Sequence, residues 1–170
     1  FINRAVPVLV VPTGVSFVTA GENHSLFIKA DGSLWSMGSN EFGQLGDSTL
    51  TNRSTPVQVI PAEVSFVSGG SNHTLALKVD GTLWAMGSNA SGAFGDGTTI
   101  DSMVPRFVIN DVSTVSAGKD YSLIVNTDGS LQSVGENSFG QLGDGGTNDR
   151  ASLDQVVASG VTAVSAGLNG

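Results

Sequence analysis

Two histidines are the first residues of this sequence that could bind a metal or transfer a proton. His24 and His73 are the only histidines, and they occupy the same position in two copies of a repeated segment, whose third copy has Tyr121 there. Zinc requires several ligands that converge on one point, whereas equivalent points of successive repeats lie well apart. We therefore expect a structural imidazole, hydrogen-bonded at the start of a strand, and no metal site.

Two acidic stretches superficially resemble calcium-binding loops. Asp96 to Asp101 reads DGTTID, and Asp144 to Asp149 reads DGGTND. Both lack the alternating acidic ligands and the closing glutamate of an EF-hand loop, and the corresponding DSTLTN at 47 to 52 lacks the second acid. Asp and Gly are also ordinary turn residues, so turn formation is the favoured interpretation and no bound cofactor is expected.

The sequence offers no recognisable catalytic or phosphate-binding arrangement. It contains no GxSxG nucleophile motif, and the glycines of GQLGDGG are followed by neither a lysine nor a helical pattern. Asp47, Asp96 and Asp144 recur as part of the repeat, which explains them by backbone geometry. We therefore predict that the protein is not an enzyme.

Composition restricts the classes of partner. Seven basic residues stand against fifteen acidic ones, giving a net charge of -8, and nucleic acid is not an expected partner because phosphate binding needs clustered Lys and Arg. The apolar stretch from Val6 to Val11 contains Pro7 and ends at Pro12, so no membrane insertion is expected. Cysteine is absent, and charged residues make up only 13% of the chain. Together with abundant Gly, Ser, Thr and Asn, this composition favours an extracellular or cell-surface location.

One segment of about fifty residues is repeated along the chain. GENHSLFIKADGSLWSMGSN at 21 to 40 aligns without gaps with residues 70 to 89 and 118 to 137, and a further copy opens with GLNG at 167 to 170. INRAVPVLV at 2 to 10 matches TNRSTPVQV at 51 to 59. We interpret the chain as one domain, 1 to 170, with repeats at approximately 2–50, 51–99, 100–147 and an incomplete 148–170.

Each repeat contains the pattern of four β-strands. Asp-Gly pairs between apolar runs predict tight hairpins in which both central residues have positive φ. Each hairpin joins two strands, a third strand precedes them, and a short fourth strand follows a proline that suits its first position or a sheet edge. The expected strands are Val15 to Thr19, Val64 to Ser68 and Val112 to Ser116; His24 to Lys29, His73 to Lys78 and Tyr121 to Asn126; Ser33 to Met37, Thr82 to Met86 and Ser130 to Val134; and Val57 to Ile60 and Arg106 to Ile109.

Four strands per unit of about fifty residues predict an all-β fold, a β-propeller of four-stranded antiparallel blades. The run of AG, NHSLxx, DGxLWxxG and GQLGDG resembles the repeats of the regulator of chromosome condensation family over essentially the whole chain. This resemblance implies blades of a seven-bladed ring, of which about three to three and a half are present. The missing blades are expected in the rest of a longer chain, or else open blade edges self-associate.

Variable positions inside the repeated loop NxxGQLGD are the candidate partner-binding residues. They are Glu41 and Phe42, Ala90 and Ser91, and Ser138 and Phe139.

Other repeated residues of the same segment are expected to have structural roles. Glycines of the loop are expected where the backbone turns sharply or approaches a neighbouring strand. Trp35 and Trp84 occupy one repeat position and are expected to pack in the core or between blades. NxS/T triplets begin at Asn23, Asn52, Asn72 and Asn89.

A rigid ring with variable loops favours a non-enzymatic scaffold that binds another protein through one face. Two alternatives stay open. One is an extracellular or surface-assembly protein that self-associates through its repeats. The other follows from the resemblance, because the family includes a nucleotide exchange factor for a small GTPase, as well as a β-lactamase inhibitor and a light sensor.

Overall fold

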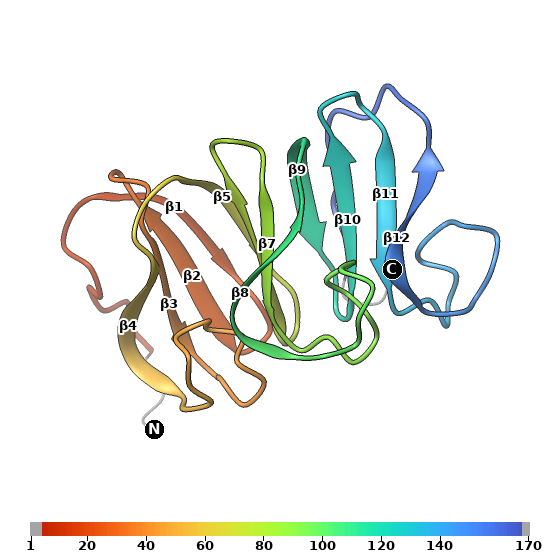
Figure 1. Cartoon of the computed structure of the whole chain (residues 1–170). Coiled ribbons are helices and arrows are strands. Elements are labelled where there is room, and N and C mark those ends of the chain that lie inside the picture. The colour runs from red at the N-terminus through yellow and green to blue at the C-terminus, as the bar shows by residue number, and fades with distance from the viewer. Residues whose placement is uncertain (1–4, 168–170) are drawn as a thin grey trace.

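The computed structural model describes residues 5–167, which form three four-stranded sheets that lie side by side (Figure 1). In each sheet, or blade, every strand pairs with the next strand in the chain, and all pairs are antiparallel. Blade 1 contains β1 (Val15–Ala20), β2 (His24–Lys29), β3 (Leu34–Gly38) and β4 (Arg53–Ile60); blade 2 contains β5 (Val64–Gly69), β6 (His73–Lys78), β7 (Leu83–Gly87) and β8 (Ser102–Ile109); blade 3 contains β9 (Val112–Ala117), β10 (Tyr121–Asn126), β11 (Leu131–Gly135) and β12 (Arg150–Val157). The all-β partial propeller predicted from the sequence is confirmed. Nothing in residues 5–167 forms a helix of the length and hydropathy needed to cross a membrane.

The strands match the expected ones closely, apart from the outermost strand of each blade. β4 and β8 begin at Arg53 and Ser102, four residues earlier than predicted, and β12 was not assigned from the sequence. Pro56 and Pro105 lie inside these strands instead of at their first positions. They are tolerated because β4 and β8 are edge strands, where a missing N–H breaks no ladder bond.

The Asp-Gly hairpins differ from the prediction in their turn type. Gly32 has a φ of 77°, but Asp31 does not have a positive φ. The Lys29 carbonyl accepts a hydrogen bond from the N–H of Gly32, and the Asp31 carboxylate accepts one from the N–H of Ser33 at 3.0 Å. This is a three-residue loop with a left-handed glycine at its end. Asp is therefore needed as a side-chain acceptor, which is why the prediction of two positive φ angles was wrong.

Blades pack face to face through aliphatic side chains. One cluster joins Leu26, Ile28 and Leu34 of blade 1 to Val67, Ala76 and Met86 of blade 2, and a second joins equivalent residues of blades 2 and 3. The middle strands are therefore buried on both sides, whereas β4 and β8 keep one exposed face. Because the hydrophobic core lies between sheets, each blade depends on its neighbour for stability.

The boundaries of the blades do not coincide with the boundaries of the sequence repeats. The unit from 51 to 99 contains β4 of blade 1 together with β5, β6 and β7 of blade 2. Residues 5–14 and 158–167 form no strand, and most of the fourth copy of the motif, at 167 to 170, lies outside the described residues. The long loops 39–52, 88–101 and 136–149 lie at one end of the blades, and the Asp-Gly hairpins lie at the other (Figure 1).

Candidate protein-interaction surface

A buried asparagine organises each long loop. Asn40 accepts a hydrogen bond from the N–H of Leu45 through its Oδ1, at 2.9 Å. Its Nδ2 donates to the carboxylate of Asp47 and to the carbonyl of Thr49, at 3.0 and 2.9 Å. Asn89 and Asn137 repeat this arrangement in the other two loops. The polar side chain replaces the regular hydrogen bonds that a loop backbone lacks, so the loops have a defined shape.

The aspartates at 47, 96 and 144 begin corresponding stretches of the three long loops. Their carboxylates interact with groups of the same chain. Asp47 accepts from the hydroxyl of Thr49 at 2.6 Å and from Nε of Arg53 at 2.6 Å. Burial alone would raise its pKa, but these hydrogen bonds hold the pKa of Asp47 below its ordinary value. Asp144 is bound in the same way by Arg150, at 2.8 Å. Within residues 5–167, no three potential metal ligands converge. The acids therefore shape the loops.

The loop glycines permit each long loop to contact the next blade. A Cβ on Gly43 would lie 2.5 Å from the Cα of Met103, and one on Gly92 would lie 2.4 Å from the Cα of Ala151. Such distances exclude any side chain. Beside these contacts, the N–H of Ser48 donates to the carbonyl of Met103, and the N–H of Gly97 donates to that of Ala151. The expectation that these glycines mark close backbone approaches is confirmed.

The six candidate residues from the sequence lie on the long-loop end. Glu41, Ala90 and Ser138 are exposed, and Ser91 is half-buried. Phe139 is 80% exposed and Phe42 is 39% exposed. Because Gly43 contacts Met103, Phe42 lies at the junction of blades 1 and 2, whereas Phe139 lies on the loop of blade 3.

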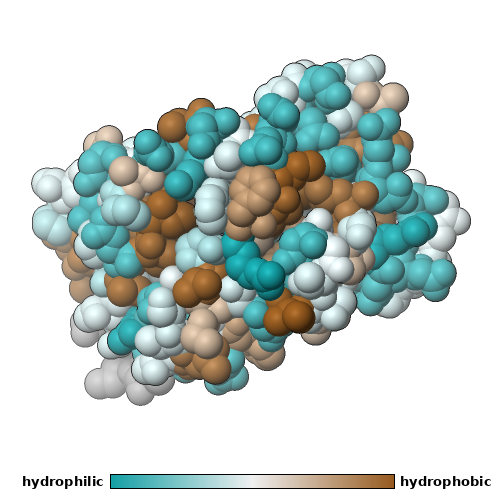
Figure 2. Space-filling view, in the orientation of Figure 1, coloured by the Kyte–Doolittle hydropathy of each residue, from teal (hydrophilic) through white to brown (hydrophobic). Residues whose placement is uncertain are grey.

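Three further apolar side chains are exposed at this end and were not singled out from the sequence. They are Leu50, Ile100 and Met103. For Leu50 and Ile100 the available signal was an apolar residue in a loop of otherwise polar residues, whereas Met103 lies at the start of β8. In Figure 2, hydrophobic residues reach the surface in the lower part of the view, where Figure 1 shows the long loops.

Acidic side chains lie near the inner turns of the same end. Burial raises the pKa of Asp120 above its ordinary value; Lys119 opposes this shift, while Glu136 and Glu22 add to it. Glu22 also accepts a hydrogen bond from the hydroxyl of Ser71 at 2.7 Å. The long-loop end thus combines exposed apolar side chains with negative charge.

The histidines and tryptophans have structural positions. His24 bonds to Thr74 of the next blade and His73 bonds to Ser122, as expected for structural imidazoles. Burial lowers the pKa of each histidine to about 4. Trp84 packs against the cluster between blades 1 and 2, and Trp35 stacks on Phe27. His24, His73 and Trp84 thus connect neighbouring blades, whereas Trp35 packs within blade 1.

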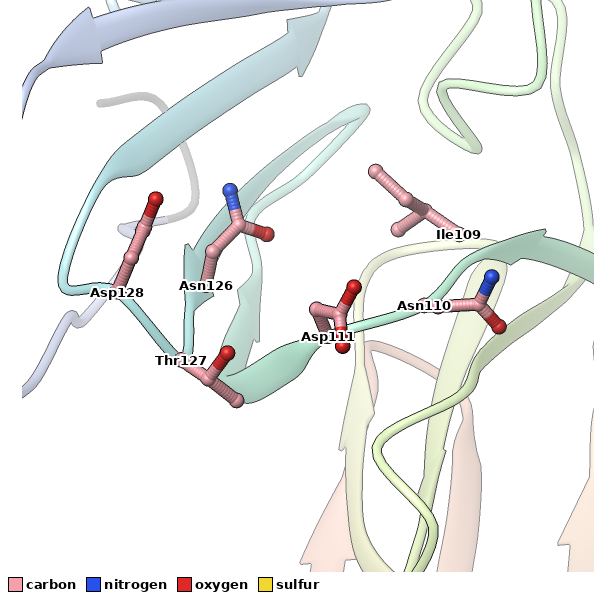
Figure 3. Close-up of a pocket in the computed structure, with 6 residues that line it drawn as sticks. All are labelled: Ile109, Asn110, Asp111, Asn126, Thr127 and Asp128. Atoms are coloured by element: carbon pink, nitrogen blue, oxygen red, sulfur yellow. The ribbon is translucent and has the colours of Figure 1, made fainter.

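A separate hollow of about 440 Å³ lies at the Asp-Gly end, between blades 2 and 3 (Figure 3). Its lining offers mainly hydrogen-bond acceptors, including the carboxylates of Asp111 and Asp128 and the Oδ1 of Asn126, which has no partner among the described residues. Hydrogen bonds from the side chain and backbone of Ser130 lower the pKa of Asp128. Ile109, Asn110 and Thr127 complete the lining.

Solved structures with the same fold include Prp20p from Saccharomyces cerevisiae, described with its binding properties to Gsp1p and histones. It is 23% identical to this chain, with a TM-score of 0.78 over 85% of this chain and 39% of Prp20p. Human WBSCR16 is 20% identical, with a TM-score of 0.63 over 90% of this chain and 56% of that protein. The chain therefore spans less than two thirds of either protein, and these identities show a shared fold only. No curated protein sequence matches the chain.

Family models give a direct assignment. The model described as regulator of chromosome condensation (RCC1) repeat matches residues 31–77 and 80–125. A second model with the same description matches residues 15–44, 64–93 and 112–141, the first three strands of each blade and the beginning of its long loop. Each model covers more than half of the sequence. The chain belongs to the RCC1 repeat family.

Proposed function

We propose that this chain is a protein-binding scaffold and that its long-loop end is the surface on which the partner docks. The observation that carries this proposal is the exposure of large apolar side chains on the long loops, whose backbone is held by buried asparagines, and at the start of β8. Phe139 and Phe42 are the aromatic members, and Ile100, Leu50 and Met103 are the aliphatic ones. Exposed aromatic side chains on a rigid support are suited to anchoring a protein partner, because little conformational entropy is lost on binding.

The partner's surface is defined by this chemistry. Glu22, Asp120 and Glu136 place negative charge beside the apolar loops, so a complementary surface has an apolar patch flanked by Lys or Arg. RCC1-repeat propellers are generally binding and regulatory proteins, and solved structures of Prp20 are described with its protein partners Gsp1p, histones and Kap60. At this sequence identity the likeness concerns the fold, so these partners are those of Prp20 alone.

Capture of partners by an immobilised chain tests the proposal. We expect a variant with Phe42→Ser, Ile100→Ser and Phe139→Ser to lose proteins that the unchanged chain binds from an extract of its source. The matched control is Val79→Ser, because Val79 is 69% exposed but lies at the Asp-Gly end. Equal capture by the triple variant would show that binding uses another surface. The same preparation tests nucleotide release from a panel of small GTPases, for which we expect no acceleration.

A further inference from the structure

The two junctions between blades differ at their Asp-Gly ends. Between blades 1 and 2, residues that include Pro61, Lys78 and Trp84 leave a hollow of only about 110 Å³. Between blades 2 and 3, the hollow of Figure 3 measures about 440 Å³. Both junctions lie inside the chain, between blades that have all four strands. The difference between them therefore comes from the residues that form each junction.

Two replacements between the repeats account for the larger hollow. Asn126 of β10 occupies the position of Lys78 of β6, and Gln132 of β11 occupies that of Trp84 of β7. A long cationic side chain and a large aromatic one are thus replaced by two smaller neutral amides. Space that side chains fill between blades 1 and 2 stays open between blades 2 and 3.

Between blades 1 and 2, the chain places its own ammonium group at this position. The Nζ of Lys78 lies 5.2 Å from the centroid of the Trp84 ring and 4.0 Å from a carboxylate oxygen of Glu63. Asp111 is the equivalent of Glu63, because each directly precedes an inner strand and has a positive φ. The junction between blades 2 and 3 therefore keeps the acid, while a neutral amide stands in place of the lysine.

The hydrogen-bond network fixes the orientation of the Asn126 amide. Its Nδ2 donates to the hydroxyl of Ser130 at 2.9 Å. That hydroxyl donates its only hydrogen to the Asp128 carboxylate, which helps to lower the pKa of Asp128, so it must accept from Asn126. In blade 2 the indole of Trp84 is the corresponding donor to the hydroxyl of Thr82. The Oδ1 of Asn126 therefore points away from Ser130, and it is buried with no hydrogen-bond partner among residues 5–167.

The hollow combines acceptors and negative charge with an apolar wall. In Figure 3 the amide oxygen of Asn126 points toward the side of the hollow that Ile109 and Asp111 form. Asp111 and Asp128 contribute carboxylates, and the half-buried Ile109 contributes an aliphatic surface. The described residues that line the hollow include no Lys or Arg. Such a lining suits a ligand that carries a positive charge and N–H donors on a short alkyl chain.

We propose that the hollow between blades 2 and 3 binds an alkylammonium group, which takes the place that the Nζ of Lys78 has between blades 1 and 2. The ammonium donates to the Oδ1 of Asn126 and to the carboxylate of Asp111, and its alkyl chain packs on Ile109. The group belongs to a lysine side chain of another protein or to a free amine, since both present the same chemistry. This site lies at the opposite end from the long loops, so it goes beyond the proposed function.

NMR titration of the isotope-labelled chain tests binding with two probes, n-butylammonium chloride and N-acetyl-lysine amide. We expect each probe to give saturable shifts of the side-chain amide signals of Asn126 and of the backbone amides of Asp111 and Thr127. n-Butanol, which has nearly the same size without the charge, and sodium chloride at equal ionic strength are expected to leave these signals in place. Shifts that do not saturate, or that n-butanol reproduces, overturn the proposal.

Three variants assign the binding to this hollow. Asn126→Lys restores the residue of the other two blades, so its own ammonium is expected to occupy the hollow and to weaken binding of both probes by about tenfold or more. Asp111→Asn keeps the shape but removes a charge, and we expect binding to weaken by about fivefold. Asp80→Asn is the matched control, because Asp80 is the blade 2 equivalent of Asp128, and it is expected to leave the affinity unchanged. Circular dichroism checks the fold of each variant. Unchanged affinity of Asn126→Lys, or an equal loss in Asp80→Asn, overturns the assignment.

The two probes distinguish the sources of the ammonium group. Saturation by n-butylammonium alone assigns the site to free amines, and saturation by N-acetyl-lysine amide alone assigns it to lysine side chains of proteins. Saturation by both supports recognition of the ammonium group in either source. Saturation by neither overturns the proposal.

Calcium competition separates the ammonium site from a metal site. Ca²⁺ requires about six to eight oxygen ligands, and no three His, Cys, Asp or Glu side chains converge in the part of the chain that the structure describes. We therefore expect calcium chloride to weaken probe binding no more than sodium chloride of equal ionic strength does. Displacement of n-butylammonium at much lower concentrations of calcium would make this a metal site and would overturn the proposal.

Discussion

The imidazole of His24 in blade 1 and the hydroxyl of Thr74 in blade 2 are joined by a buried hydrogen bond of 3.0 Å. The Thr74 hydroxyl donates its only hydrogen to the carbonyl of Gln44 at 2.8 Å, so the imidazole Nε2 must be the donor. His73, Ser122 and the carbonyl of Ala93 repeat this chain between blades 2 and 3. Each of these two interfaces thus contains a buried chain of hydrogen bonds among aliphatic side chains.

Removal of the Thr74 hydroxyl should destabilise the fold. Thr74→Val keeps the shape of the side chain but leaves the Nε2 of His24 and the carbonyl of Gln44 without partners. Buried groups without hydrogen bonds cost about 1–3 kcal/mol, and we expect a loss of this size in the free energy of unfolding by urea. Thr99→Val, at an exposed loop position, is expected to change it by less than about 0.5 kcal/mol. Equal effects of the two substitutions would contradict the role of this connection.

Acidification should destabilise the protein before its carboxylates titrate. Burial lowers the pKa of His24 and His73 from 6.5 to about 4. The unfolded chain therefore binds a proton on each imidazole near pH 6.5, whereas the folded chain does so only near pH 4. Stability falls as the pH decreases between these values, by up to about 1.4 kcal/mol per pH unit for each histidine.

Urea unfolding at pH 7.0, 6.0 and 5.0 measures this dependence. His24→Gln and His73→Gln are each expected to remove about half of the slope, because glutamine does not titrate. A slope that is unchanged in both variants would assign the effect to other groups.

The loop at Gly92 approaches the next blade closely. Adding one methyl group there should therefore strongly reduce the free energy of unfolding. Gly92→Ala places a Cβ 2.4 Å from the Cα of Ala151 and also strains a backbone with a φ of 80°. Gly145→Ala strains the same backbone angle but meets nothing within 4 Å. We expect Gly145→Ala, the control, to lower the free energy of unfolding by about 1–2 kcal/mol. Gly92→Ala should lower it by about 1–3 kcal/mol more, measured by thermal or urea unfolding. Equal costs would show that backbone conformation alone selects glycine here.

The buried asparagine of the second loop offers a test of loop order. Asn89→Ala removes the acceptor for the N–H of Phe94 and the donor to the carbonyl of Thr98. We expect a loss of stability on the order of 3 kcal/mol and faster cleavage of residues 88–101 by a nonspecific protease. Asn110→Ala, at an exposed asparagine, serves as control and should cleave at the unchanged rate.

The strands of the fold could be predicted well because the same strand pattern occurs three times in the chain. The bounds of β2, β6 and β10 are those predicted, since their polar first residues and Asp-Gly turns delimit them. The outer strands were predicted too short, because edge strands lack the burial that makes a pattern visible. β12 in particular contains Asp154 and Gln155.

Contacts between blades could not be predicted from the spacing of residues along the sequence. His24 and Thr74 are separated by fifty residues, and only the packing of two sheets brings them within 3.0 Å. The six candidate surface residues followed from variation within the repeat, whereas Leu50, Ile100 and Met103 became candidates only when their exposure was known. Repetition reveals what all copies share, and it gives no information on how far a single side chain protrudes.

The long loops of blades 1 and 2 each contact the blade that follows, so these links between blades run from neighbour to neighbour along the chain. A gene that gains or loses one stretch of 48 or 49 codons therefore inserts or deletes a self-contained module, and every remaining junction keeps its original chemistry. Such a protein can change its size by duplication without redesign of its interior.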